Sequence, residues 1–189
     1  MKLTREELTP ELLCELLSYD HETGELVWRK RDLKWFANAH RANIWNAKWA
    51  GKSAFTAVNA HGYRAGAVLE VTVVSQRVAW AMYSGEWPRG QIDHINGVKT
   101  DNRISNLRDV TSEQNLHNAP RRATNKSGVT GVFWTERSRK WRVYICVKSR
   151  LTHLGYFKDF DEAVAARKAA EHHYGYHPNH GREPNASAV

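Results

Sequence analysis

The chain has 189 residues, of which 41% are hydrophobic and 25% are charged, and its formal net charge is +8. This length suits one or two small domains with true hydrophobic cores. No apolar run approaches the roughly 18 residues of a membrane span, and the first residues, MKLTREELTPELL, lack the apolar stretch of a signal peptide, so we expect no membrane segment.

The N-terminal residues predict a helix followed by a strand. Residues 5–18 carry leucines at helical spacing, with Pro10 in the first turn and Thr9 as a possible N-cap. The sequence then offers a turn at Glu22–Gly24 and a short strand at Leu26–Arg29.

The next fifty residues are less regular. Residues 32–62 have no clean period and predict an irregular excursion with a short helix near Lys34–Ala39. The stretch GYRAGAVLEVTVV predicts two strands with a tight turn around Ala67–Glu70. Residues 75–85 then predict a short helix with Ser75 as N-cap and a glycine stop.

A polar segment, IDHINGVKTDNRISNLR, occupies residues 92–108 and is too polar for a core element. We expect short strands at Ile92–His94 and Leu107–Val110, joined by a loop. A helix should begin at Thr111, because Gln114 three residues later completes a capping box.

The side chains of this segment suggest chemistry. The Asp93 carboxylate and the Asn115 amide supply hard oxygen ligands of the kind that Mg²⁺ prefers, and His94 can accept a proton from water near neutral pH. The alternative is a hydrogen-bonded, Asn-rich loop in which His94 has a structural role. The residues alone leave both readings open.

The motif DHINGVKTDNRISNLR followed by SEQNLHN resembles the HNH family of metal-dependent endonucleases, especially the phage and intron-encoded homing type. The resemblance covers roughly residues 8–118 and also includes LLSYDHETGELVW and RVAWAMYSGEWPRGQ. It implies that Asp93 and Asn115 bind the metal, that His94 is the general base, and that Asn106 pins the loop at the catalytic site. The two other amides of the segment, Asn96 and Asn102, are then expected to form turns. Relatives often have His where this chain has Gln76, so a helper role at that position is left open.

The C-terminal part predicts a second, small domain. Residues 119–128, APRRATNKSG, resemble a linker. Alternating apolar residues predict three strands between 130 and 157, separated by turns at Glu136–Arg139 and Lys148–Arg150. Residues 161–174 predict a helix that packs on the sheet, with Asp159 or Asp161 as N-cap, and a flexible tail should follow from residue 177.

The excess positive charge lies almost entirely in this part. Residues 121–160 hold ten Lys and Arg against two Asp and Glu, which is a net +8. Such a concentration is typical of a surface that binds a polyanion, although a solvated charged face is the simpler alternative. Strand alternation places Arg142 and Tyr144 on one face and Val143 and Ile145 on the other, which should pack on the helix.

The segments SGVTGVFWTERSRKWRVYI and HLGYFKDFDEAVAARKAA resemble the APETALA/ethylene-response-factor (AP2/ERF) DNA-binding domain. Trp141 is either part of the core or a DNA contact. The full set of candidate DNA-binding residues is Arg77, Arg103, Arg121, Arg122, Arg137, Lys140, Arg142, Tyr144, Lys148 and Arg150.

We therefore expect an α+β protein with a ββα-metal nuclease domain at 1–118, a linker at 119–128, a three-stranded AP2/ERF-type domain at 129–176 and a tail at 177–189. The resemblances imply a Mg²⁺-dependent endonuclease, with Mn²⁺ as a substitute, that acts on double-stranded DNA as a monomer in the cytoplasm of a bacterial or phage-infected cell. The two cysteines, Cys14 and Cys146, stand apart from any CxxC motif, so we expect mostly buried free thiols and no structural zinc. The competing function is a DNA-binding regulator with a degenerate HNH domain.

Overall fold

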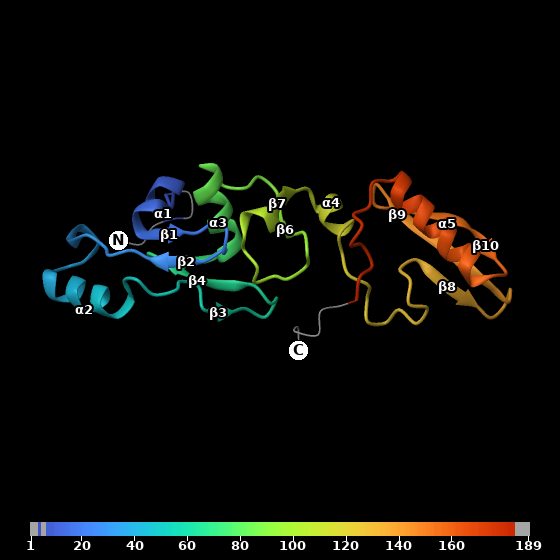
Figure 1. Ribbon diagram of the computed structural model, residues 1–189, viewed down its shortest axis with the longest axis horizontal. Coiled ribbons are helices and arrows are strands. Elements are labelled where there is room, and N and C mark those ends of the chain that lie inside the picture. The colour runs from blue at the N-terminus through green and yellow to red at the C-terminus, as the bar shows by residue number, and fades with distance from the viewer. Residues whose placement is uncertain (1–3, 5–6, 184–189) are drawn as a thin grey trace. The chain divides into compact units, whose positions relative to one another are not determined.

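The computed structural model of the protein describes residue 4 and residues 7–183 (Figure 1). The chain forms two compact units, the first ending at Asp109 and the second beginning at Val110. Helices and small antiparallel sheets occur in both, so the predicted α+β class is confirmed. The break precedes the predicted domain end at 118, because the segment after Val110 contacts the C-terminal sheet: Glu113 Oε1 accepts from the Lys148 amide at 2.9 Å.

The N-terminal unit begins with α1 (Pro10–Leu16), whose first turn is capped by the Thr9 side chain as predicted. The helix is shorter than residues 5–18, because Leu17–Tyr19 forms β1 and pairs antiparallel with β2 (Leu26–Trp28). The predicted strand at 26–29 and its preceding turn are thus confirmed, although residues 5 and 6 lie outside the described part of the chain.

The predicted helix near Lys34–Ala39 is wrong. The structure has a 3₁₀ turn, η1 (Leu33–Trp35), and then an eleven-residue helix, α2 (Ala39–Trp49). The Asn38 side chain accepts from the Arg41 amide and so begins the helix at residue 39. Ala42 is the one residue of α2 that is buried, and this explains why the segment has no apolar period.

The predicted hairpin is confirmed and extends into a three-stranded sheet of β3 (Ala57–Val58), β4 (Arg64–Val68) and β5 (Val71–Val74). The two turn residues, Leu69 and Glu70, both have positive φ, at 47° and 68°. This is the conformation of the turn that best matches the twist of a two-residue hairpin.

The helix α3 (Ser75–Ser84) was also predicted, and Gly85 ends it with φ 78°. Ser75, however, is not its N-cap. Val74 holds the cap position without a side-chain hydrogen bond, and the buried Ser75 hydroxyl accepts a hydrogen bond from Asn102 instead. The helix packs against α1, where Leu13, Leu16 and Val78 are fully buried in the core of the unit.

The polar segment forms β6 (Gln91–His94), a 3₁₀ turn η2 (Ile104–Asn106) and β7 (Leu107–Val110), and β6 pairs with β7. Next in the chain comes α4 (Ser112–Leu116), which begins with the predicted Thr111–Gln114 capping box. The order strand, loop, strand, helix was therefore predicted correctly from the sequence.

The C-terminal unit contains a three-stranded sheet of β8 (Val132–Thr135), β9 (Lys140–Val147) and β10 (Arg150–Phe157), covered by α5 (Phe160–His173). The Asp159 side chain caps α5, as predicted. Val132, Val143 and Ala163 form its core, and Trp141 packs on Phe160 with ring centroids 4.6 Å apart. Trp141 is therefore a core residue.

Residues predicted as a linker and a tail are paired in part. The Gly181 amide donates to the Ala119 carbonyl and the Arg121 amide to the Arg182 carbonyl, both at 2.9 Å, and His180 is buried. Residues 177–183, which were predicted to be part of a flexible tail, thus form backbone hydrogen bonds with residues 117–121. Residues 184–189 lie outside the described part.

A polar cluster stabilises the interior of this unit. Arg167, only 2% exposed, donates from Nε to Glu171 at 2.9 Å, and its Nη2 lies 3.2 Å from His180 Nε2. Burial lowers the pKa of His180 to about 4, so this imidazole is neutral at pH 7.

Two other expectations concern the whole chain. Within the part that the structure describes, no helix is long and apolar enough to cross a membrane. Cys14 and Cys146 are free thiols as expected, but both are exposed, so the prediction that they are buried is wrong.

Candidate active site

Asn106 fixes the loop between β6 and β7. Its Oδ1 accepts from the Asn96 amide at 2.9 Å, and its Nδ2 donates to the Asp101 carbonyl at 2.8 Å. The Ile95 amide also donates to the Asn106 carbonyl. The side chain of Asn106, at the end of the loop, is therefore hydrogen-bonded to its start at Asn96 and to its middle at Asp101.

His94, at the end of β6, is only 3% exposed. Its Nε2 lies 3.2 Å from Asn102 Oδ1, and Asn102 Nδ2 donates to Ser75 Oγ at 2.8 Å. Since the amide uses its NH₂ group on Ser75, its oxygen faces the imidazole, and the neutral imidazole would carry its proton on Nε2. Burial lowers the pKa of His94, so the ring is neutral at pH 7 and can accept a proton.

Residues of the N-terminal hairpin form hydrogen bonds with the loop that carries Asn102. The Tyr19 hydroxyl donates to the Asn102 carbonyl at 2.6 Å, and the Ile104 amide donates to the His21 carbonyl at 3.1 Å. Gly24 has φ 78°, and a Cβ added there would lie 2.5 Å from the Arg103 amide nitrogen. Close backbone approach thus requires glycine in the hairpin turn and links residues 19–24 to the site.

The side chain of Asp93 has a different partner from that of His94, its neighbour in sequence. Its Oδ2 accepts from Arg108 Nε at 2.8 Å and from Nη2 at 2.6 Å, across the β6–β7 pair. The Asp93 side chain is 8% exposed and that of Arg108 is 30% exposed. His94 instead contacts Asn102 and the ring of Tyr63, with centroids 5.8 Å apart, as strand alternation leads one to expect.

The other predicted metal ligand, Asn115, lies in α4 of the C-terminal unit and is half-buried. Within the described residues, no group of three or more His, Cys, Asp and Glu side chains is arranged to hold a metal ion. The carboxylate of Asp93 and the amide of Asn115 nevertheless have the donor chemistry that suits a hard divalent cation.

The surface of the loop carries an ion pair. Arg103 donates to Asp101 from Nε and Nη2, at 2.8 and 2.6 Å, and this contact lowers the pKa of Asp101 to about 2. The Asn96 side chain accepts from the Val98 amide, so this residue forms the turn, as expected. Arg103, a candidate DNA contact, is half-exposed but already has a carboxylate partner.

Arg77, a predicted DNA contact, has a structural role that the sequence did not suggest. It donates to the Pro88 carbonyl at 2.9 Å and to the Gly90 carbonyl at 2.8 Å, and so fixes the loop that enters β6. Its neighbour Gln76 is only 5% exposed, and its Oε1 has no hydrogen-bond partner among the described residues. Neither side chain lies on an open surface.

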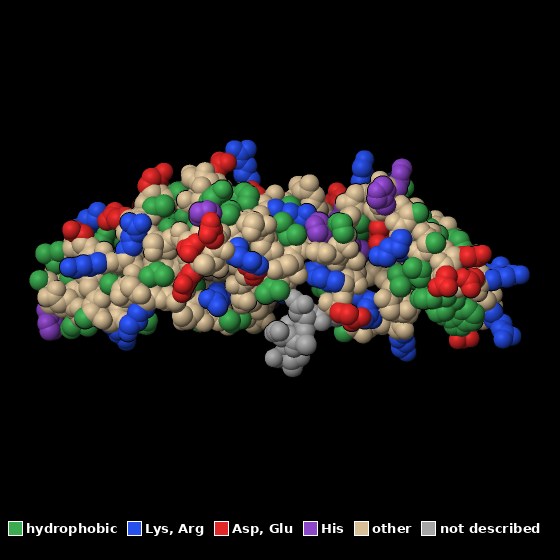
Figure 2. Space-filling model, in the orientation of Figure 1, with side chains coloured by type: hydrophobic (Ala, Val, Ile, Leu, Met, Phe, Trp, Pro, Cys, Tyr) green, Lys and Arg blue, Asp and Glu red, His purple; other side chains and the backbone are tan. Residues whose placement is uncertain are grey.

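The face of the C-terminal sheet opposite α5 is aromatic and basic. Arg142 lies between Phe133 and Tyr156 in the strand register, and its guanidinium lies 4.3 Å from the ring centre of Tyr144. His153 pairs with Tyr144 on the neighbouring strand. Basic side chains project from the surface around β8 and β10 (Figure 2).

The remaining candidates for DNA contact differ in exposure. Those at the surface are Arg122, Arg137, Lys148 and Arg150, while Lys140 is half-buried. Arg121 is mostly buried, with hydrogen bonds to the Asn125 carbonyl and to Glu183, and so has a structural role.

Sequence reasoning missed three residues of the site. Asn102 was expected to form a turn, and neither Ser75 nor Arg108 was expected to contact the motif residues. The Asn102–Ser75 hydrogen bond joins residues 27 positions apart, and no local pattern predicts such a contact. The contact of Arg108 could have been suggested by strand pairing, because Arg108 is the second residue of the predicted strand Leu107–Val110.

Comparisons with known proteins identify the family of this segment. Residues 74–117 match the family model described as HNH endonuclease, which spans α3, the β6–β7 loop and α4. Protein 3.8 of Escherichia phage T7 is 30% identical over 87 residues, which are 46% of this chain and 71% of that protein. No solved structure matches the chain. The chain therefore belongs to the same family as Protein 3.8 of phage T7, and its residues 74–117 form an HNH endonuclease domain.

Proposed function

We propose that the protein is a metal-dependent DNA endonuclease of the phage homing or nicking type, with the ββα-metal fold at its active site. The observation that carries the proposal is the buried, neutral His94, held by Asn102 inside the segment that matches the HNH endonuclease model. A buried imidazole with a lowered pKa is suited to act as a general base at neutral pH.

In this mechanism His94 removes a proton from a water molecule, and the water oxygen attacks the phosphorus of the scissile phosphodiester. The 3′ oxygen leaves as the new bond forms. Asn102 holds the imidazole, and Asn106 keeps the loop in place. Both act as positioning residues, because their side chains are committed to hydrogen bonds within the chain.

Asp93 and Asn115 would hold the divalent cation, which is Mg²⁺ or its substitute Mn²⁺. When bound, such an ion stabilises the negative charge that develops on the phosphate and on the leaving oxygen. Both Arg108 hydrogen bonds go to Oδ2 of Asp93, so Arg108 fixes the orientation of this carboxylate across the β6–β7 pair. Arg108 would then orient the ligand.

The C-terminal unit would bind double-stranded DNA as an AP2/ERF-type domain, through the sheet face opposite α5. Arg142 and Tyr144 lie on that face, and Arg137, Lys140, Lys148 and Arg150 lie in or beside its two turns. Arg and Lys on phosphates provide affinity, and their contacts to base edges provide specificity. We propose a monomer that acts in the cytoplasm of a bacterial or phage-infected cell.

A second function is favoured by one observation. Arg108 already neutralises Asp93, as would be expected in a DNA-binding regulator whose HNH domain no longer binds metal. Cleavage mapped on both strands of a random DNA library separates the two. The endonuclease requires cuts with Mg²⁺ or Mn²⁺ and none with EDTA, whereas uncut DNA under all conditions, with binding intact, would establish the regulator.

A further inference from the structure

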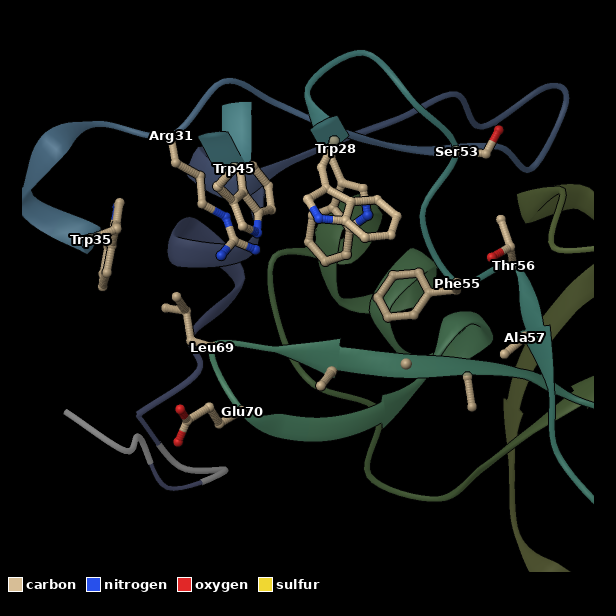
Figure 3. A pocket seen from close by; sticks show the side chains of 14 residues that line it. Trp28, Arg31, Trp35, Trp45, Ser53, Phe55, Thr56, Ala57, Leu69 and Glu70 are labelled. Atoms are coloured by element: carbon tan, nitrogen blue, oxygen red, sulfur yellow. The ribbon is translucent and has the colours of Figure 1, made fainter. Parts of the chain in front are cut away.

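The N-terminal unit contains an aromatic pocket that the proposed active site does not use. It has a volume of about 590 Å³, within the range of ligand-binding pockets, and is lined by residues from 28 to 70 (Figure 3). Four tryptophans and Phe55 contribute to its wall. Trp28 meets Trp45 edge to face, with centroids 5.8 Å apart, and Phe55 lies 5.9 Å from Trp28.

A cation lies among these rings. The Arg31 guanidinium is 3.9 Å from the ring centre of Trp45 and 5.0 Å from that of Trp28, and Figure 3 shows it pointing into the pocket. Among the described residues it has no carboxylate partner, and its buried Nε has no hydrogen-bond partner. Burial lowers the pKa of Arg31 to about 10, so the group remains charged at pH 7.

Two more cations lie over rings of the same wall. Lys34 Nζ is 5.2 Å from the ring centre of Trp35 and forms an ion pair with Glu15 at 2.8 Å, and Lys48 Nζ is 4.9 Å from the ring centre of Trp49. Neither lysine lines the pocket itself, so Arg31 is the cation that faces it. Among the described residues, Glu70 is the one carboxylate that lines the pocket. The pocket therefore combines flat aromatic surfaces with positive charge, which suits a ligand that is both aromatic and anionic.

The wall of the pocket includes an unusual backbone conformation at Phe55. Phe55 has φ 55°, an unusual conformation for a bulky residue, and is only 4% exposed. Gly66 lies beneath it, and a Cβ there would approach Phe55 Cδ1 to 3.1 Å. A larger residue at position 66 would therefore require the Phe55 ring to shift.

We propose that this pocket binds a single unstacked nucleotide, with the base against Trp28 and Trp45 and its phosphate on Arg31. Base–aromatic stacking depends little on sequence, and a planar guanidinium suits a phosphate oxygen pair. The choice of a nucleotide over other aromatic anions rests on the proposed nuclease function. Its source is either a strand of DNA or a free nucleotide, and a pocket of this size excludes a stacked duplex.

The test uses the full chain in EDTA, so that binding is measured without cleavage. The probes are a single-stranded oligonucleotide containing 5-iododeoxyuridine, followed by ultraviolet crosslinking and peptide mapping, and free dAMP as competitor. We expect crosslinks to Trp28 or Trp45. Trp45→Ala should weaken pocket binding by about 5- to 100-fold, the loss that one stacked base represents. Arg31→Gln removes the charge that would hold the phosphate and should also weaken pocket binding.

Arg41→Gln is the matched control, because Arg41 is an exposed arginine of the same helix as Trp45 that does not line the pocket. Competition by dAMP would identify a free nucleotide as a ligand, and crosslinks that dAMP leaves unchanged would identify the DNA strand. Crosslinks confined to the C-terminal sheet, or unchanged in the folded Arg31→Gln protein, would overturn the proposal. Metal-dependent cleavage is scored separately, so a protein that crosslinks at Trp45 but never cuts would refute only the nuclease.

Discussion

The side-chain oxygen of Asn102 lies 3.2 Å from Nε2 of His94, and this contact connects the motif histidine to the rest of the N-terminal unit. Through Nδ2, the same amide reaches Ser75 at the start of α3, and its backbone carbonyl accepts from Tyr19 of the hairpin. Three segments distant in sequence thus determine the orientation of one imidazole. Asn102 is thus the residue through which the rest of the unit would orient the proposed catalytic base, His94.

Replacing Asn102 tests this relationship. Asn102→Ala should lower the cleavage rate by about 10- to 100-fold, the usual effect of removing a supporting partner from a site. Asn102→Asp keeps the acceptor but adds negative charge, which should raise the pKa of His94. Because the base must be neutral, the acid limb of the pH–rate profile should then move to higher pH. Asn96→Ala, in the same loop, is the control, and an unshifted profile in Asn102→Asp would show that His94 is not the titrating base.

Gly24→Ala tests the contribution of the hairpin. The new Cβ would lie 2.5 Å from the Arg103 amide, so the hairpin must move away from the loop that carries Asn102. Gly51→Ala is a close control, because Gly51 has the same φ of 78° but nothing within 4 Å of the added Cβ. Urea unfolding should show Gly24→Ala to be less stable than Gly51→Ala by about 1–3 kcal/mol. Equal stability would mean that the contact contributes nothing.

Arg142→Ala tests the sheet face of the C-terminal unit. If the guanidinium contacts a phosphate, its removal should weaken binding to all DNA sequences and reduce the slope of log affinity against log salt by about 1. Lys158→Ala, which removes an exposed charge just beyond β10, is the control. Salt titrations of duplex binding measure both, and identical slopes for the two variants would argue against this face.

His180 makes stability depend on pH. Its pKa is lowered from 6.5 to about 4, chiefly by burial, so protons bind the unfolded chain more readily than the folded one in this range. Its contribution is complete above pH 6.5 and is lost as the pH falls toward 4. His180→Gln, which retains an acceptor for Arg167, should flatten this decline in urea unfolding. His172→Gln, at an exposed position of α5, should leave it unchanged.

Local patterns predicted much of the fold. Thr111 with Gln114 predicted the start of α4, and the alternation of residues 140–147 predicted β9, because capping and strand alternation are local effects. The helix α2 was misplaced because Ala42 is its one buried residue, so its sequence carries no apolar stripe. In that case a single cap, Asn38, determined where the helix begins.

The site was predicted by motif but not in its connections. Asn96 and Asn102 lie in the same polar loop, yet Asn96 forms an exposed turn and Asn102 is buried against His94 and Ser75. This difference arises from packing between segments 27 positions apart, which composition and spacing do not encode. The aromatic pocket was missed for the same reason, because its wall is assembled from a strand, a helix and a sheet.

The most direct test of the account is the rate at which the protein cleaves supercoiled plasmid with Mg²⁺, compared with His94→Ala and Asn96→Ala. A positioned general base contributes about 10²- to 10⁴-fold, so His94→Ala should lose that much while still binding DNA, and Asn96→Ala should retain most activity. EDTA should abolish cleavage by the wild-type protein. Cleavage by His94→Ala at the wild-type rate would contradict the proposed mechanism, and a wild-type protein that binds DNA but cuts with neither Mg²⁺ nor Mn²⁺ would contradict the proposed function.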